Sequence, residues 1–163
     1  MFQKRPSEHQ KTLTGARLRA YAFALLAKRE HSQKELRDKL ERYAINPDEV
    51  DVLIQELAEQ HYQSDERVAK LVLSSQIRQG KGPRRIAQTL QKKSIDQEYI
   101  ENDLHDIDWL EHAYQLKIKK FGLAVSKDQK EIAKQIRYLQ YRGYDMDVIF
   151  KAIRREANDE DCY

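Results

Sequence analysis

The chain has 163 residues, of which 35% are charged and 40% are hydrophobic, and its formal net charge at pH 7 is +3. This length suits one ordinary domain or a short array of small units, and the share of apolar residues argues against a disordered chain. No apolar run approaches the roughly 20 residues that span a bilayer. The lone cysteine, Cys162, excludes a disulfide framework.

The two ends of the chain are polar. Residues 1–15 lack the apolar core of a signal peptide, and residues 158–163 are rich in acids. We therefore expect a flexible N-terminal arm over 1–15 and a frayed acidic tail over 158–163. With no membrane segment and no disulfide framework, the sequence predicts a cytoplasmic protein.

Between these ends, apolar residues at helical spacing and helix-cap signals predict nine helices and no sheet. The expected helices are 16–29, 33–43, 47–59, 64–79, 83–93, 96–107, 108–121, 127–142 and 145–157. They group into three-helix units over 16–62, 63–107 and 108–157. The predicted fold class is all-α: three tandem three-helix units forming an elongated, curved helical array.

Several sequence signals define the helix ends. Ser32 with Glu35 forms a capping box, and Asn46-Pro47 offers an N-cap followed by proline at the first helical position. Gly82-Pro83 repeats the proline signal, and Gly122 and Gly143 stand where helices end in a left-handed residue.

An internal repeat of about fifty residues supports the three units. In the first two units the matching apolar pairs are Leu36/Ile86, Leu40/Leu90, Ile45/Ile95, Val50/Ile100, Ile54/Leu104 and Leu57/Ile107. The third unit continues the series with Leu139, Tyr144, Ile149 and Ile153. These positions are predicted to be buried and equivalent.

The charges alternate in blocks with the same period. Basic side chains dominate residues 1–45, 67–93 and 113–142, whereas 46–66 and 94–112 carry seven acids each and no Lys or Arg. Such polarity favours docking on a charged, extended partner. The acids also have an intramolecular interpretation, which we favour, as partners of basic helices in the neighbouring unit.

One basic cluster stands out as a candidate binding site: Arg78, Lys81, Arg84, Arg85, Lys92 and Lys93. A helix start at Gly82-Pro83 lies inside it, where backbone N–H groups and the helix dipole favour an anion. Arg84 and Arg85 oppose that dipole, so a phosphate or an acidic partner is expected to compensate them. The alternative is a solvated basic face.

Tyrosines near the C-terminus suggest a second contact. Tyr138, Tyr141 and Tyr144 recur every three residues beside Arg137 and Arg142, a pattern that can stack on nucleobases. Tyr144 occupies a repeat core position, so packing is favoured for it.

No catalytic or metal site emerges from the sequence. A phosphate-binding loop, a dinucleotide turn and a nucleophile motif are all missing. His105 and His112 are expected to be separated by a helix junction at Ile107–Asp108, and no partner with zinc-ligand spacing accompanies them. We therefore expect no enzyme activity and no cofactor.

Four patches in order resemble the RecX family, bacterial regulators of the RecA recombinase. They are Leu26–Arg29 with His31–Leu40, His61–Ala69, Arg78–Ile86 before Leu90, and Leu139–Tyr144. The resemblance covers about residues 16–157. The second patch departs from the family pattern: His61 stands in a glycine place, Gln63-Ser64 in a Leu-Asp place, and Val68 in a phenylalanine place.

The resemblance implies a non-catalytic monomer that binds RecA filaments on DNA, lowers RecA ATPase and strand exchange, and acts in the SOS response, DNA repair and homologous recombination. It also implies weak, non-specific binding to single- or double-stranded DNA. The predicted filament or DNA contacts are Arg78, Lys81, Arg84, Arg85, Lys92, Lys93, Arg137 and Arg142. Two alternatives stay open: a stand-alone DNA-binding protein of tandem helical modules, and a helical scaffold for another protein.

Overall fold

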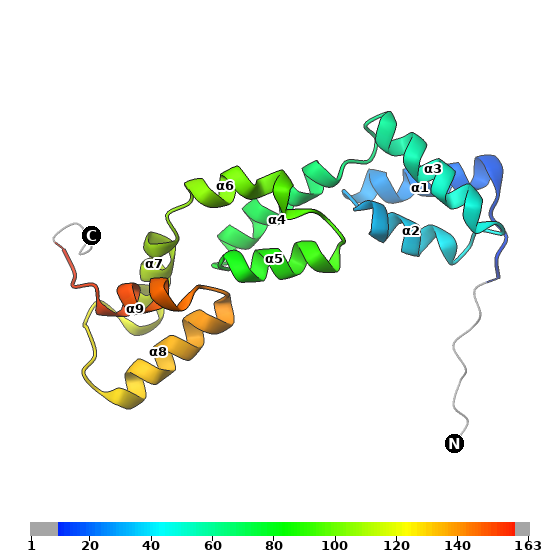
Figure 1. Ribbon diagram of the computed structural model, residues 1–163. Coiled ribbons are helices and arrows are strands. Elements are labelled where there is room, and N and C mark those ends of the chain that lie inside the picture. Colours follow the sequence, from blue (N-terminus) through cyan, green and yellow to red (C-terminus); the bar gives the residue numbers. More distant parts are fainter. Residues whose placement is uncertain (1–9, 159–163) are drawn as a thin grey trace, which may run out of the picture. The chain divides into compact units, whose positions relative to one another are not determined.

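A computed structural model describes residues 10–158, which contain nine α-helices and one short 3-10 helix (Figure 1). The helices are α1 (Gly15–Lys28), α2 (Gln33–Glu41), α3 (Pro47–Glu59), α4 (Asp65–Arg78), α5 (Pro83–Lys92), η1 (Gln97–Ile100), α6 (Glu101–Asp106), α7 (Trp109–Phe121), α8 (Gln129–Arg142) and α9 (Met146–Arg154). The predicted all-α tandem fold is confirmed.

The first three helices enclose one core. Leu18, Leu36, Leu40, Val50 and Leu57 are fully buried in it. The predicted caps form: the Ser32 hydroxyl accepts from the Glu35 N–H while the Glu35 carboxylate accepts from the Ser32 N–H. The Asn46 side chain accepts from the Asp48 N–H, and Pro47 opens α3. Local sequence therefore determines where these helices begin.

Part of the expected N-terminal arm contacts the first three-helix group. Residues 1–9 lie outside the described part of the chain, as does most of the expected acidic tail. The backbone N–H groups of Thr12 and Leu13 both donate to the Tyr43 carbonyl, at 2.9 and 2.8 Å, and the Thr14 hydroxyl donates to Glu49 at 2.8 Å. The described end of the arm is thus bound to this group.

The sixth expected helix is interrupted. Residues 97–100 form the 3-10 turn η1, capped by the Asp96 carboxylate, and α6 begins only at Glu101. Ile100 has φ −126° and ψ 13°, which departs from helical geometry and separates the two segments. Ile100 itself is buried, whereas every other side chain of residues 97–106 is exposed or only half-buried.

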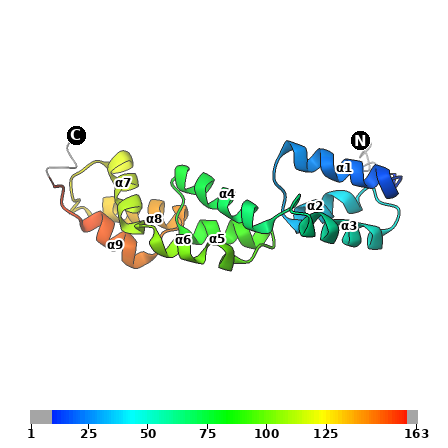
Figure 2. The same cartoon turned by 90° about the horizontal axis from the view of Figure 1, so that it is seen from above.

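The last three helices, α7 to α9, lie against one another (Figure 2). They pack around Tyr114, Leu139, Tyr144 and Ile149. Trp109 packs on this core and donates its indole N–H to the Leu104 carbonyl at 3.0 Å. Gly143 ends α8 in the left-handed conformation, at φ 97° and ψ 22°. The expected packing of Tyr144 is confirmed.

The repeat predicts burial at most of its positions, with three exceptions, Ile45, Leu104 and Ile107. Leu40, Leu90 and Leu139 are exposed by only 0%, 1% and 0%. Ile45, however, is 57% exposed, and Ala44 is buried in its place. The reason is local: Ala44 forms an isolated bridge with Leu13, and extended backbone turns successive side chains to opposite sides. Leu104 and Ile107 are only half-buried.

By compactness the chain divides into two units. One comprises the residues up to Val68 together with Lys93–Ile95, and the other comprises Ala69–Lys92 and the residues from Asp96 onward. The end of α4, α7 and the end of α8 all lie within the second unit.

Candidate functional site

A basic groove lies where the end of α4 meets α7 and the end of α8. It has a volume of about 510 Å³, and its cations are Arg78, Lys119, Lys120 and Arg142. Among the described residues that line it, none is an Asp or Glu. A concave surface with charge of one sign concentrates anions. The groove therefore suits a phosphate backbone or an acidic protein segment.

Two cations of the groove flank one aromatic ring. The Arg142 guanidinium lies 5.5 Å from the centroid of the Tyr138 ring, and the Lys120 ammonium lies 5.8 Å from it. Tyr138 in turn packs edge-on against Phe121. Arg142 also donates to the Gln79 carbonyl at 2.8 Å. Aromatic and backbone contacts thus position these charges, and neither has an acidic partner among residues 10–158.

A buried tyrosine fixes the turn beside the groove. The Tyr144 hydroxyl donates to the Gly80 carbonyl at 3.3 Å. Burial raises the pKa of Tyr144 to about 12, so the phenol stays a hydrogen-bond donor at neutral pH.

Arg84 and Arg85 each have a partner within the molecule, in addition to any external contact that the sequence predicts. Arg84 Nε lies 2.5 Å from an Asp145 carboxylate oxygen, and Arg85 Nε donates to the Tyr141 carbonyl at 2.9 Å. The Arg85 guanidinium lies 4.5 Å from the Tyr141 ring centroid. The compensating partners of this helix start therefore come from α8 and the residues after it.

Lys93 is also paired internally. Its ammonium lies 2.5 Å from a Glu35 oxygen, and both side chains are largely buried. Burial by itself would raise the pKa of Glu35, but hydrogen bonds from Lys93, the Ser32 N–H and Arg29 outweigh it and lower the pKa to about 2. Glu35 thus serves the capping box and the Lys93 pair at once.

This pairing predicts an acid-sensitive contribution to stability. The Glu35 pKa is lowered from its usual 4.5, so the contribution is complete above about pH 4.5 and is lost as the pH falls toward 2. We expect Glu35→Gln to reduce the free energy of unfolding by on the order of 2 kcal/mol at pH 7. The difference from wild type should shrink toward pH 3.

Urea unfolding at several pH values measures this effect. Glutamine keeps the capping geometry, so the substitution isolates the charge. Glu59→Gln is the matched control, because Glu59 accepts a hydrogen bond only from exposed Gln55 among the described contacts. A pH-independent difference for Glu35→Gln would contradict this account.

The other predicted contacts remain available to a partner. In the described part of the chain, Arg78, Lys81, Lys92 and Arg137 form no ion pair. Arg78 and Arg142 are brought together in the groove, whereas Lys92 lies in the last turn of α5. The predicted set is therefore divided, and only Arg78 and Arg142 of it line the groove.

The groove includes residues that the sequence analysis did not select. Lys119 and Lys120 close α7, and their place in the basic stretch 113–142 was the one signal that could have found them. Lys117, from the same stretch, is buried and donates to the carbonyls of Leu123 and Ala124 at 3.1 and 2.9 Å. Burial lowers its pKa. The number of basic residues in this stretch does not tell which lysines line the groove and which one is buried.

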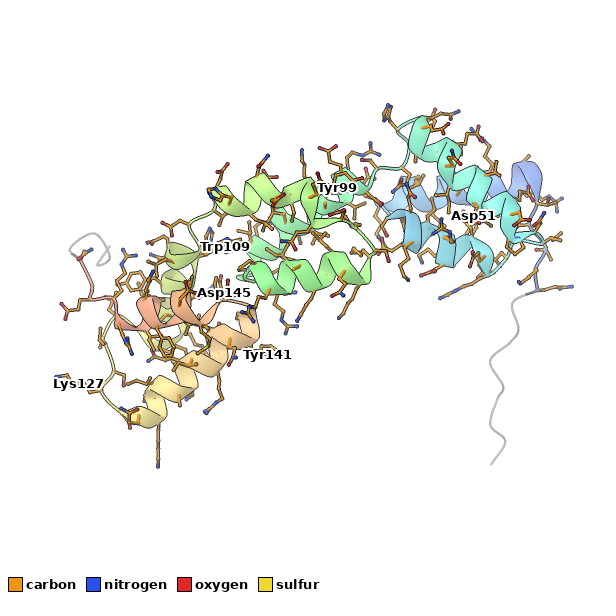
Figure 3. All side chains as sticks on the ribbon, in the orientation of Figure 1. Asp51, Tyr99, Trp109, Lys127, Tyr141 and Asp145 are labelled. Carbon is orange, nitrogen blue, oxygen red and sulfur yellow. The ribbon has the colours of Figure 1, made fainter. Side chains whose placement is uncertain are left out.

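The acidic stretch 46–66 forms intramolecular pairs, but inside its own three-helix group. Asp51 pairs with Arg37 and Glu56 with Arg19, each at 2.9 Å (Asp51 is labelled in Figure 3). Partners in a neighbouring unit were expected instead. Helix packing within the group brings α3 alongside α1 and α2, which explains the difference.

The described helices offer neither a metal-binding cluster nor a membrane-spanning segment. Within residues 10–158, no group of three or more His, Cys, Asp or Glu side chains could hold a metal ion. His105 and His112 are separated by the break between α6 and α7, as expected. Over the same residues, the helices are too short or too polar to cross a bilayer.

Comparisons with known proteins agree on one family. Models of the first, second and third three-helix domains of RecX match residues 19–57, 64–102 and 106–153. The chain is 56% identical to the regulatory protein RecX of Acinetobacter baylyi over 155 residues, covering 95% of this chain and 98% of that protein.

More distant relatives give the same result. The chain is 37% identical to the regulatory protein RecX of Vibrio parahaemolyticus, covering 98% of this chain and all of that protein. It is also similar to the crystal structure of RecX from Lactobacillus salivarius, with a TM-score of 0.72 and 25% identity over 84% of this chain and 92% of that one.

Proposed function

The chain belongs to the RecX family, and from this premise we propose that it regulates RecA by binding the RecA–DNA filament. In this proposal it lowers RecA's DNA-dependent ATPase and strand exchange, catalyses no reaction itself, and works as a cytoplasmic monomer. Its direct contact with DNA, single- or double-stranded, is weak and independent of sequence.

The observation that carries the proposal is the basic groove. Its four cations face a hollow of about 510 Å³ and meet no acid among the described lining residues. A RecA–DNA filament presents phosphates and protein acids on one extended object, and either chemistry would satisfy these charges.

The eight residues that the sequence predicts to contact the filament or DNA have different roles in this proposal. Arg78 and Arg142 belong to the groove, joined by Lys119 and Lys120. Lys81, Lys92 and Arg137 add charge outside it. Arg84, Arg85 and Lys93 act indirectly, because internal partners already hold them.

The direct test is RecA ATPase on single-stranded DNA, titrated with this protein. We expect the rate to fall at substoichiometric to equimolar protein, and we expect Arg78→Gln combined with Lys120→Gln to require several-fold more protein for the same inhibition. If phosphate is the partner, the slope of log affinity against log salt should become shallower by about 1.4–1.8, at about 0.7–0.9 per lost contact.

A double variant with the same loss of charge is the control. Lys28→Gln with Lys151→Gln removes two exposed cations that lie outside the groove. It should inhibit RecA as wild type does. Wild-type protein that leaves RecA ATPase and strand exchange unchanged at every concentration would end the proposal. Tight DNA binding without any effect on RecA would favour the stand-alone DNA-binding alternative.

A further inference from the structure

The solvent-facing side of α8 carries a row of cations that ends at an exposed tyrosine. The row consists of Lys130, Lys134, Arg137 and Tyr141, all exposed and spaced by four, three and four residues. This spacing places them along one side of the helix. At 1.5 Å per residue the row is about 16 Å long. We call it the α8 row.

The α8 row has a strong excess of positive charge. Glu131 is the one acid within α8, against the row's three cations and Arg142. In the described part of the chain, no ion pair involves a cation of the row. The row therefore presents unneutralised charge over several turns of a rigid helix.

Tyr141 is unusual for a large aromatic residue because it is 74% exposed (Figure 3). Arg85 approaches its ring to 4.5 Å and donates to the Tyr141 carbonyl. Arg85 is thus held beside the ring by two contacts, while most of the side chain faces solvent. Core packing does not explain this position, since Leu139 and Tyr144 supply the core contacts of this region.

We propose that the α8 row binds single-stranded nucleic acid, with an unpaired base stacked on Tyr141 and phosphates beside Lys130, Lys134 and Arg137. The proposal deepens the proposed function and rests on it for the setting, a filament on DNA. Aromatic rings that alternate with cations along a surface are typical of single-strand binding. A duplex offers no free base face, because its bases are already stacked and paired.

An acidic protein segment is the rival occupant. It would satisfy the three cations but would leave the exposed ring beside Arg85 without a role. Tyr99 provides an internal comparison, because it is 45% exposed but lies among the acids of residues 96–103. Exposure alone therefore does not create this site, and the combination with cations distinguishes Tyr141.

Fluorescence anisotropy with three labelled probes tests the proposal on the full-length protein. The probes are oligothymidylate, an abasic single strand of the same length, and a duplex of the same length. We expect Tyr141→Ala to weaken oligothymidylate binding about 5- to 150-fold, since stacking of one base contributes about 1–3 kcal/mol. Tyr141→Phe should stay within about twofold of wild type. Affinity for the abasic strand should not change in either variant.

Two further variants distinguish the contribution of phosphate contacts from that of base stacking. Arg137→Gln should weaken binding to the oligothymidylate and abasic strands equally and reduce the salt slope by about 0.7. Tyr99→Ala, the matched control, should bind every probe as wild type does. Circular dichroism melts of all variants should coincide with wild type, because each changed side chain is exposed.

These binding measurements test the inference without requiring any effect of the protein on RecA. Unchanged oligothymidylate binding by Tyr141→Ala, or equal losses on the thymidylate and abasic strands, would overturn it. Weaker filament binding with unchanged oligothymidylate binding would overturn it in favour of the protein partner. If wild type leaves RecA ATPase unchanged but Tyr141→Ala loses base-dependent binding, the α8 row stands and the proposed function fails.

Discussion

Replacing Leu40 or Leu90 by Ala is expected to lower the free energy of unfolding by about 2–5 kcal/mol. Leu40 and Leu90 are 0% and 1% exposed and occupy the same position in successive repeats. Each substitution removes buried apolar surface and leaves a cavity that rigid helix packing cannot close. The loss is a large fraction of the stability of a small domain.

Urea unfolding followed by circular dichroism measures this loss. Leu71→Ala is the matched control, because Leu71 is 54% exposed and its truncation should change stability by no more than about 0.5 kcal/mol. If the Leu40 and Leu90 variants unfold like wild type, the repeat alignment does not describe the cores. Equal losses at both positions would support equivalent roles in their helix groups.

Gly143→Ala is expected to destabilise the second compact unit by about 2–4 kcal/mol, through backbone strain and steric overlap. Gly143 has φ 97°, and a Cβ atom there would lie 2.7 Å from the Arg85 backbone nitrogen and 2.6 Å from Arg85 Cγ. The Gly143 carbonyl accepts from the Arg84 N–H at 3.0 Å, and the Gly82 N–H donates to the Arg142 carbonyl at 2.8 Å. The two turns are therefore in direct backbone contact.

Substitution of a second glycine distinguishes the cost of backbone strain from the cost of steric overlap. Gly15 also has a positive φ, 53°, but a Cβ atom there would have no neighbour within 4 Å. Gly15→Ala should therefore show only the conformational part, about 1–2 kcal/mol. Equal losses at Gly15 and Gly143 would show that the close approach contributes nothing.

The Gly143 substitution should also affect binding. The contact between the Gly82 and Gly143 turns holds Arg85 beside Tyr141 and Arg142 beside Gln79. If Ala at position 143 separates the turns, oligothymidylate affinity should fall in the same variant. Anisotropy at a temperature where the variant remains folded checks this expectation.

The sequence by itself determined the helices, the repeat and the family resemblance. Local signals suffice for helix ends, because a capping side chain such as Ser32 or Asn46 acts on backbone groups two or three residues away. Burial at Leu40, Leu90 and Leu139 followed from periodicity alone. The prediction from periodicity failed at Ile45. There, the backbone bridge between Ala44 and Leu13 turns the Ala44 side chain inward and the Ile45 side chain outward.

Only the tertiary structure decided which charges are free. The sequence predicts external contacts for Arg84, Arg85 and Lys93, and only folding brings them to their internal partners Asp145, Tyr141 and Glu35, which lie 56 to 61 positions away. Lys117 is buried and Lys120 lines the groove, although they are three residues apart. Charge is a property of the residue, whereas its availability depends on neighbours that folding brings together from distant parts of the chain.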